Sequence, residues 1–454
     1  MTLTRRIPLR PGALVAAALR WPERYPVLFD SAAKGALSQA SILGALPRAA
    51  LWKTTDGHLH TEGTAPPQGT SFLAELARWL RRESTGAARP DGVPFAGGWA
   101  VFLGYEIARE IESRVPATPF SADVDAFALR LPVTVVDAHD GFAQIASEPG
   151  VSREATDSVI ADLESVTIAE PTGDTVVLEV REEDPAAYVD RVLRAQEYIR
   201  AGDIYQANLS RPWQVRLAPG VGPAQLYPRL RRANPAPFAA LAQFRGETLL
   251  SSSPERLLRI QGDRIDTRPI AGTHPRGATP EDDARLAAQL IAHPKERAEH
   301  VMLIDLERND LGRVCRAGTV VVDEYMAVET YAHVHHIVSN VSGRLRADAG
   351  VIDALRATFP GGTITGCPKL RCMQIIAELE GAARGAYTGS LGYINLDGSA
   401  DFNILIRTMT QRGDALTFRA GAGIVADSDA QREVQETRAK ARGMLLALGS
   451  PAAP

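Results

Sequence analysis

Two segments with helical character each carry a pair of glutamates three residues apart. Glu296 and Glu299 lie in HPKERAEH, and Glu433 and Glu436 lie in REVQETRAK, with Lys440 one further turn on. This spacing places both carboxylates of a pair on one helical face. Two such helices can surround a hard divalent cation; Mg²⁺ takes one or two carboxylates directly and keeps several waters. Solvated helix faces often carry the same pairs, so from spacing alone a metal site and a polar surface both stay open.

Three segments rich in small residues leave backbone N–H groups uncovered, which suits them to hold a carboxylate or phosphate. They are TRPIAGTHPRG (267–277), FPGGTITGCPK (359–369) and RAGAGIV (419–425). The second segment lacks the Gly-Lys-Ser/Thr ending of a Walker A loop, which disfavours nucleotide binding. Each segment taken alone is also typical of a plain turn.

Two isolated polar residues add further chemistry. His336, in HVHHIVS, is expected to titrate near neutrality and could shuttle protons, although a structural histidine is an equally ordinary role. Arg407 is a charge within the apolar run FNILIRTMT and needs a partner if it is buried. That partner is either a substrate carboxylate or an acidic residue of the core.

The elements that would position these residues alternate between strands and helices. Apolar periodicity predicts helices over residues 70–82, 185–201, 368–379 and 281–298, the last continuing through 314. Strand patterns cover residues 25–30, 95–107, 129–138, 204–217 and 402–410. Residues 150–174 are acidic, polar and poor in aromatics, so we expect a connection there between an N-terminal region, 1–149, and a catalytic domain, 175–450.

Composition limits the possible functions. The 454 residues are 45% hydrophobic and carry a net charge of −4, which is ordinary for a soluble protein and gives no case for nucleic acid or a membrane surface as partner. The apolar run 13–19 is too short for a signal peptide or a membrane span. The three cysteines have no metal-ligand spacing and form no even disulfide set. A cytoplasmic location is therefore expected.

In this order, the motifs resemble those of the chorismate-utilising enzymes, and more closely the large subunits of anthranilate synthase and aminodeoxychorismate synthase. The motifs are IYQANLS, SSSPERLLR, TRPIAGT, HPKERAEHVMLIDLERNDLGRV, HVHHIVS, FPGGTITGCPKLRCMQII, GYINLDG, ILIRT and AGAGIVADSDAQREVQETRAK. The match covers residues 185–447 closely, and LFDSAA and FAGGWAVFLGYE agree more loosely. The resemblance implies an α+β fold in which two large antiparallel sheets form a sandwich with helices outside.

The resemblance also assigns roles around Mg²⁺ and chorismate. It implies that Glu299 and Glu436 are direct metal ligands and that Glu296 and Glu433 act through water. His336, Gln206, Thr363 and Lys440 match catalytic positions of the family. The positions that match substrate-binding residues are Gly272, Thr273, Tyr393, Arg407, Gly421, Ala422 and Gly423.

Gln206 indicates which nucleophile arrives. In the family, members that add water have a lysine at this position as general base, whereas members that add ammonia have glutamine. The sequence therefore predicts amination, with ammonia supplied by a separate glutamine amidotransferase subunit in a heterodimer. A non-catalytic regulator that binds chorismate or tryptophan is the alternative from another class, and the intact set of glutamates and His336 argues against it.

The site of amination on the ring rests on conflicting signals. Ala271 stands where many aminodeoxychorismate synthases have a nucleophilic lysine, and this favours anthranilate synthase. LFDS at 28–31, NPAPF at 234–238 and PGGTITG at 360–366 differ from the usual anthranilate synthase forms. Together they favour amination para to the ring carboxylate, giving 4-amino-4-deoxychorismate for para-aminobenzoate and folate synthesis.

Overall fold

A computed structural model describes residues 2–33, 40–85, 89–119, 124–168, 177–330 and 334–449. Within them the first of two large sheets has 12 strands, joined by antiparallel pairs such as β11 with β23. Its path is β1 (Leu3–Pro8), β9 (Phe142–Ser147), β8 (Val133–Asp137), β3 (Ser41–Ala45), β2 (Val27–Asp30), β12 (Phe238–Phe244), β13 (Glu247–Ser253), β22 (Thr408–Arg412), β23 (Ala415–Ile424), β11 (Gln206–Leu217) and β10 (Val177–Glu182), with β19 (Gly366–Cys367) paired to β11.

The second sheet has 11 strands in the described part of the chain and is also antiparallel, as in the pair of β6 with β20. Its path is β16 (Ile270–Pro275), β18 (Val334–Arg344), β15 (Arg264–Arg268), β14 (Arg256–Gln261), β21 (Ala400–Asn403), β20 (Ser390–Asn395), β6 (Gly98–Leu103), β7 (Val124–Leu131), β4 (Ala49–Thr54) and β5 (Leu59–Glu62), with β17 (Val321–Thr330) paired to β18. Both sheets combine strands from before residue 150 with strands from after residue 175.

The two sheets pack face to face, which confirms the predicted α+β sandwich. Strand alternation explains the packing. In β6, Ala100 and Phe102 point into a cluster between the sheets that also contains Leu249 of β13. Trp99 and Val101 point to the opposite face and pack in the cluster that includes α2. Every residue of β6 is buried as a result.

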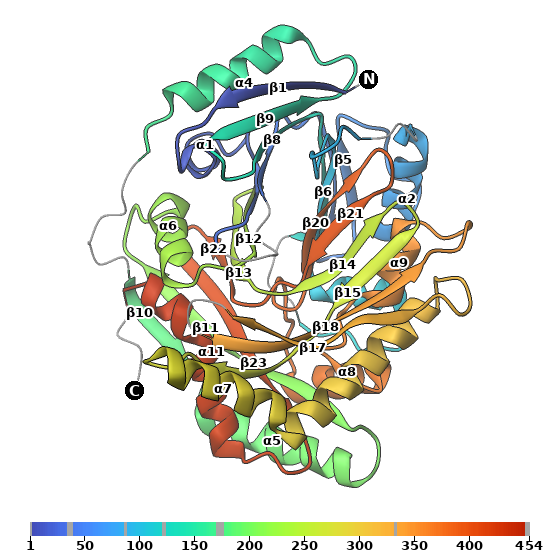
Figure 1. The fold of residues 1–454 in the computed structure, drawn as a ribbon, viewed down its shortest axis with the longest axis vertical. Coiled ribbons are helices and arrows are strands. Elements are labelled where there is room, and N and C mark those ends of the chain that lie inside the picture. Colours follow the sequence, from blue (N-terminus) through green and yellow to red (C-terminus); the bar gives the residue numbers. More distant parts are fainter. Residues whose placement is uncertain are drawn as a thin grey trace.

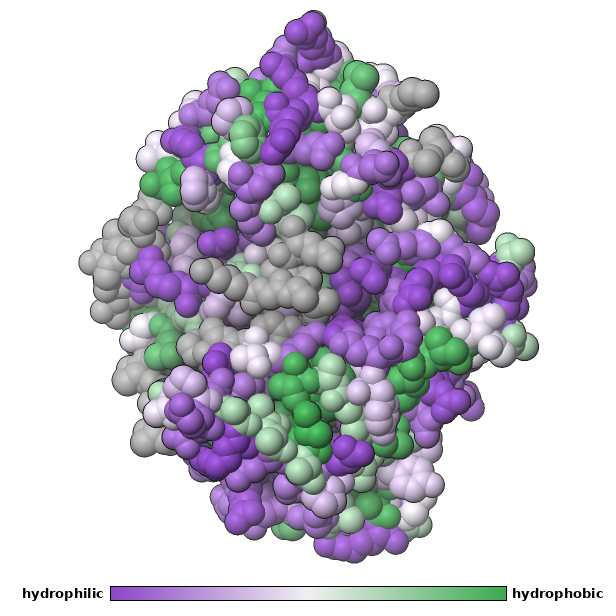
Figure 2. Space-filling view, in the orientation of Figure 1, coloured by the Kyte–Doolittle hydropathy of each residue, from purple (hydrophilic) through white to green (hydrophobic). Residues whose placement is uncertain are grey.

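Helices cover the outer faces of the sandwich (Figure 1). They are α1 (Ala13–Arg20), α2 (Phe72–Glu83), α3 (Ala108–Ile111), α4 (Arg153–Ser165), α5 (Pro185–Arg200), α6 (Pro223–Ala233), α7 (Pro280–Ala292), α8 (Pro294–Gly312), α9 (Val351–Thr358), α10 (Lys369–Glu380) and α11 (Ala430–Ala447). The α2, α8 and α9 helices pack on the second sheet, and α1, α4, α6 and α11 pack on the first. Figure 2 shows a largely polar surface on the face it presents, and no helix in the described ranges is long and apolar enough to cross a membrane.

Proline explains two of the differences from the predicted elements. The run 129–138 divides at Pro132 into β7 and β8, which lie in different sheets. The long helix predicted from residue 281 divides at His293 into α7 and α8, because Pro294 lacks the N–H that would continue the first helix. Residues 150–174, predicted as a connection, contain the helix α4, whose N-cap Ser152 accepts a hydrogen bond from the Ala155 N–H.

Candidate active site

The α8 and α11 helices bring three of the four predicted metal-binding glutamates toward one another. Gln206 Nε2 donates a hydrogen bond of 2.8 Å to Glu299 Oε1. Burial raises the pKa of Glu299, and the nearby charges of Glu296 and Glu436 add to this rise. Glu436 Oε1 lies 2.7 Å from Lys440 Nζ on the same helix. The negative charges of Glu296 and Glu436 therefore reach Glu299, and the role of these residues as metal ligands stays a prediction.

Glu433 lies one turn before Glu436 on α11. The charges of both residues reach the Tyr188 hydroxyl of α5, where they add to the effect of burial in raising its pKa well above the usual value. Both glutamates of α11 therefore lie within electrostatic reach of α5.

The end of β23 forms one wall of the candidate site. Residues 421–423 pair with Asn208–Ser210 of β11 on one side, whereas β22 pairs with β23 only up to Phe418. In the part of the chain that the structure describes, the other edge of residues 421–423 therefore carries no strand. Lys440 Nζ donates to the Gly421 carbonyl at 3.0 Å and ties α11 to this wall.

Gly423 leaves room for the Gln206 side chain. A Cβ on Gly423 would lie 2.2 Å from Gln206 Nε2 and 3.5 Å from Glu299 Oε1. We therefore expect Gly423→Ala to displace the Gln206 amide and to lower kcat/KM by about 10²-fold, the usual cost of misplacing a reacting group by about 1 Å. Steady-state kinetics would measure the loss. Gly312→Ala is the matched control, because a Cβ there meets no atom within 4 Å, and parent kinetics for Gly423→Ala would contradict the packing argument.

His336 lies on β18 beside the Gly272 backbone. Its Nδ1 is 3.3 Å from the Gly272 carbonyl oxygen, and Gly272 has a positive φ of 66°. Burial lowers the pKa of His336 to about 3, and the charges of Arg407 and Lys440 act in the same direction. The imidazole is therefore neutral at physiological pH, and the catalytic role of His336 stays a prediction.

Gly272 and Thr273 lie on β16 next to His336. The Thr273 backbone pairs with His336, and the Thr273 side chain lies outside the described residues. A Cβ on Gly272 would lie 2.9 Å from Glu296 Oε2, so this glycine lets α8 approach the sheet closely. Ala271, the position where the nucleophilic lysine would stand, is buried within β16.

Glu255 is a site residue that the sequence analysis missed. Its carboxyl accepts a hydrogen bond of 2.7 Å from Thr363 Oγ1, and the charges of Lys440 and Arg407 reach it. Complete burial nevertheless raises the pKa of Glu255 to about 7. A carboxyl that holds a proton near neutral pH, next to two cations of the site, is suited to general acid catalysis. The sequence feature that could have identified Glu255 is its position directly after the small-residue run SSSP.

Arg407 lies in a bend rather than in the predicted strand. The chain leaves the second sheet at β21 and enters the first at β22, and Arg407 has a φ of 52° at this crossing. Its charge reaches both His336 and Glu255. Arg407 thus joins the site because the strand pattern is interrupted there.

The structure places Tyr393, a predicted site residue, away from the other site residues. The ring stacks on Phe95 with centroids 4.8 Å apart and meets Phe29 edge-on, because its position on β20 points into the space between the sheets. Tyr387 instead faces the site wall, and a Cβ on Gly421 would lie 2.5 Å from Tyr387 Oη. Tyr387 therefore replaces Tyr393 as the tyrosine beside residues 421–423.

Comparison with known proteins decides the family. Residues 30–446 match the family model described as chorismate binding enzyme. The chain belongs to the chorismate binding enzymes. The predicted resemblance is confirmed over most of the sequence.

Relatives with two different activities are about equally similar to this chorismate binding enzyme. Anthranilate synthase component 1 1 of Haloarcula marismortui is 42% identical over 85% of this chain and 84% of its own length. Aminodeoxychorismate synthase component 1 of Bacillus subtilis is 41% identical over 78% of this chain and 77% of its own. The structure of anthranilate synthase component I from Streptococcus pneumoniae superposes with a TM-score of 0.78 at 32% identity, covering 90% of this chain and 93% of that one. Overall identity therefore does not separate the two activities.

The carboxylates fit a magnesium ion by their chemistry. Among the described residues, no group of three or more His, Cys, Asp or Glu side chains is placed so that it could hold a metal ion. Mg²⁺, however, requires only one or two protein carboxylates and completes its shell with water and substrate oxygens. The repulsion that helps to raise the pKa of Glu299 is the kind that a cation between the helices would relieve.

Proposed function

We propose that this enzyme aminates chorismate with ammonia and that Gln206 holds the incoming ammonia. Gln206 Nε2 is fixed by Glu299, while its buried Oε1 has no hydrogen-bond partner among the described residues. This unpartnered amide oxygen is the observation that carries the proposal. Ammonia already has a lone pair with which to attack, so it needs no base; it needs an acceptor for one of its N–H groups, which the Gln206 oxygen provides. A lysine at this position would supply a base for water instead.

In this proposal the hydroxyl group on the chorismate ring leaves near Glu255 rather than near Gln206. Glu255 donates the proton that converts the hydroxyl to water, and the Thr363 hydroxyl keeps the acid oriented. Neutral His336 lies beside the ring and stabilises it without adding a charge. Arg407, Tyr387 and the free edge of residues 421–423 hold the substrate carboxylates.

Magnesium would be held by Glu299 and Glu436 directly and by Glu296 and Glu433 through water. When bound, it supplies Lewis acidity toward the ring carboxylate and screens the glutamate charges. Lys440 keeps Glu436 in place through its ion pair and links the metal-binding helix to Gly421.

Amination para to the carboxylate, giving 4-amino-4-deoxychorismate, is favoured over anthranilate formation by the segments at 28–31 and 234–238. They meet in the structure, where Ser31 Oγ donates to the Pro237 carbonyl at 3.3 Å. Phe29, Phe95 and Tyr393 fill the adjoining space with ring contacts. In anthranilate synthases the corresponding segments usually line a tryptophan pocket.

We expect tryptophan not to inhibit this enzyme, because aromatic side chains of the chain itself occupy that region. The rate of chorismate consumption should be the same with and without about 1 mM L-tryptophan. This concentration would saturate a site with a micromolar Kd. Inhibition by tryptophan would contradict the assignment and favour anthranilate synthase.

The ammonia would come from a separate glutamine amidotransferase subunit, and both proteins would work in the cytoplasm. Without that subunit, chorismate consumption in the presence of Mg²⁺ should depend on added ammonium salt and rise with the concentration of uncharged ammonia. Consumption at the same rate in the absence of ammonium would mean that water is the nucleophile and would refute the role of Gln206.

A further inference from the structure

A second buried carboxyl, Glu307 of α8, lies beside the 359–369 segment, where the charge of Glu255 reaches it. Glu307 is 6% exposed, and a Cβ on Gly362 would lie 3.2 Å from its Oε1. The next residue, Thr363, donates its hydroxyl hydrogen bond to Glu255. Glu255 and Glu307 therefore flank two consecutive residues of one loop, and the charge of Glu255 reaches Glu307.

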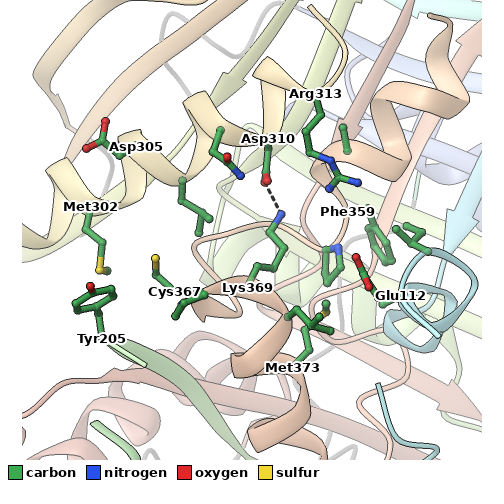
Figure 3. A pocket seen from close by; sticks show the side chains of 18 of the residues that line it. Glu112, Tyr205, Met302, Asp305, Asp310, Arg313, Phe359, Cys367, Lys369 and Met373 are labelled. Carbon is green, nitrogen blue, oxygen red and sulfur yellow. Dashed lines mark hydrogen bonds and ion pairs between the residues drawn. The ribbon is translucent and has the colours of Figure 1, made fainter. Parts of the chain in front are cut away.

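The charges of Asp310 and Lys369, which form an ion pair, reach Glu307. Both residues of this pair line a cavity outside the proposed active site. Asp310, one turn further along α8, is 2% exposed and accepts a hydrogen bond from Lys369 Nζ, which also donates to the Thr358 carbonyl at 3.1 Å. Asp310 and Lys369 point toward one another in Figure 3. Both line a cavity of about 710 Å³, which we call the outer cavity. Tyr205, 70% exposed, forms part of its rim.

The groups in this row are suited to exchange protons. Burial, together with the Asp310 charge, raises the pKa of Glu307 to about 7 against the opposing effect of the Lys369 charge. Burial likewise raises the pKa of Asp310 against the opposing effect of Lys369. The groups that face Glu307 are Asp310, Lys369, Glu255 and the Thr267 hydroxyl. None of them is a proposed metal ligand.

We propose that Glu307 and the Asp310–Lys369 pair return a proton from the outer cavity to Glu255 after each turnover. The inference rests on the proposed role of Glu255 as the acid. When the ring hydroxyl leaves, the Glu255 O–H bond breaks and the hydroxyl becomes water. Asp310 takes a proton from water in the outer cavity and passes it to Glu307, and Glu307 passes its own proton to Glu255. One proton enters from solvent, and no electrons are transferred.

Burial of Glu255 is the reason that such a path is needed. The residue is only 4% exposed and one of its carboxyl oxygens accepts the Thr363 hydroxyl, so bulk water has little direct access to it. Lys369 keeps Asp310 turned toward the cavity. Glu307 therefore acts through Glu255 and does not touch the substrate.

The variant Glu307→Gln tests the path, because it keeps the side-chain shape and removes the exchangeable carboxyl. With chorismate, Mg²⁺ and ammonium present, we expect kcat to fall about tenfold and KM to stay unchanged. This fall is smaller than the usual contribution of general acid–base catalysis, because Glu255 itself is still present. The ratio of rates in H₂O and D₂O should increase, because proton return becomes limiting. Asp125→Asn is the matched control: burial also raises the pKa of Asp125, to about 6, but none of the groups of the path faces it, and kcat and the isotope effect should match the parent.

Two results would overturn the path: a Glu307→Gln enzyme with the parent kcat and isotope effect, or one whose kcat falls without any change in the isotope effect. Should Glu307→Gln fail to fold, Asp310→Asn must give the same increase in isotope effect. Failure of the proposed function is distinguishable, because it would appear as a parent rate in Glu255→Gln. A defect in Glu255→Gln combined with parent behaviour in Glu307→Gln would remove only the proton path.

Discussion

Glu436→Gln is expected to abolish turnover, with kcat/KM lower by about 10³-fold or more, the effect of losing several kcal/mol of metal-assisted stabilisation. Glutamine keeps the shape of the side chain but removes the charge that is proposed to bind Mg²⁺ and that pairs with Lys440 at 2.7 Å. Chorismate consumption measured over a series of Mg²⁺ concentrations would show both the lower rate and the weaker dependence on the metal.

Glu433→Gln is the matched variant on the same helix. Because Glu433 is proposed to act through water, its loss should cost only about 10- to 100-fold, as is usual for groups that support metal ligands. A parent rate for Glu436→Gln would contradict the metal assignment, and so would a larger loss for Glu433→Gln than for Glu436→Gln.

Glu255→Gln is expected to lower kcat by about 10²- to 10³-fold, the usual contribution of a general acid. The parent enzyme should also lose activity as the pH rises. An acid works only while protonated, and burial raises the pKa of Glu255 to about 7, so the protonated fraction falls as the pH passes through this value. The rate should be measured from pH 6 to 9, a window of about one to two units around that pKa, with the concentration of uncharged ammonia held constant.

In Glu255→Gln this fall should disappear and leave a low rate that does not change with pH. Persistence of the same falling limb in the variant would show that another group is the acid. Thermal unfolding of the two proteins serves as the control for folding, since the Thr363 hydroxyl can donate to the amide oxygen as it does to the carboxyl.

Much of the fold follows from local patterns in the sequence, and the exceptions lie where the chain changes sheets. The helix predicted over 185–201 forms as α5, and that over 70–82 forms as α2. The runs through Pro132 and Arg407 both look like continuous strands, yet each divides between the two sheets. Alternating hydrophobicity cannot show this, because buried strands in either sheet are apolar on both faces. The division of the chain at residues 150–174 stays a prediction.

The site shows the same limit. Spacing on a helix predicts that Glu296 and Glu299 share one face of α8. That the charge of Glu436 on α11 reaches Glu299 depends on how the two helices lie in the fold, which spacing does not show. Tyr393 was predicted as a site residue from its motif alone, and only the position of β20 in the sandwich shows that it points between the sheets. Glu255 was overlooked because its importance comes from complete burial beside Thr363, which depends on contacts between distant parts of the chain.

The most direct test of the proposed function is to identify the product formed from chorismate, Mg²⁺ and isotopically labelled ammonium. We expect the label at the ring carbon para to the carboxylate, in a product that keeps the enolpyruvyl group, and no release of pyruvate. Fluorescent anthranilate as the main product, with pyruvate released in equal amount, would contradict this account and identify the enzyme as an anthranilate synthase.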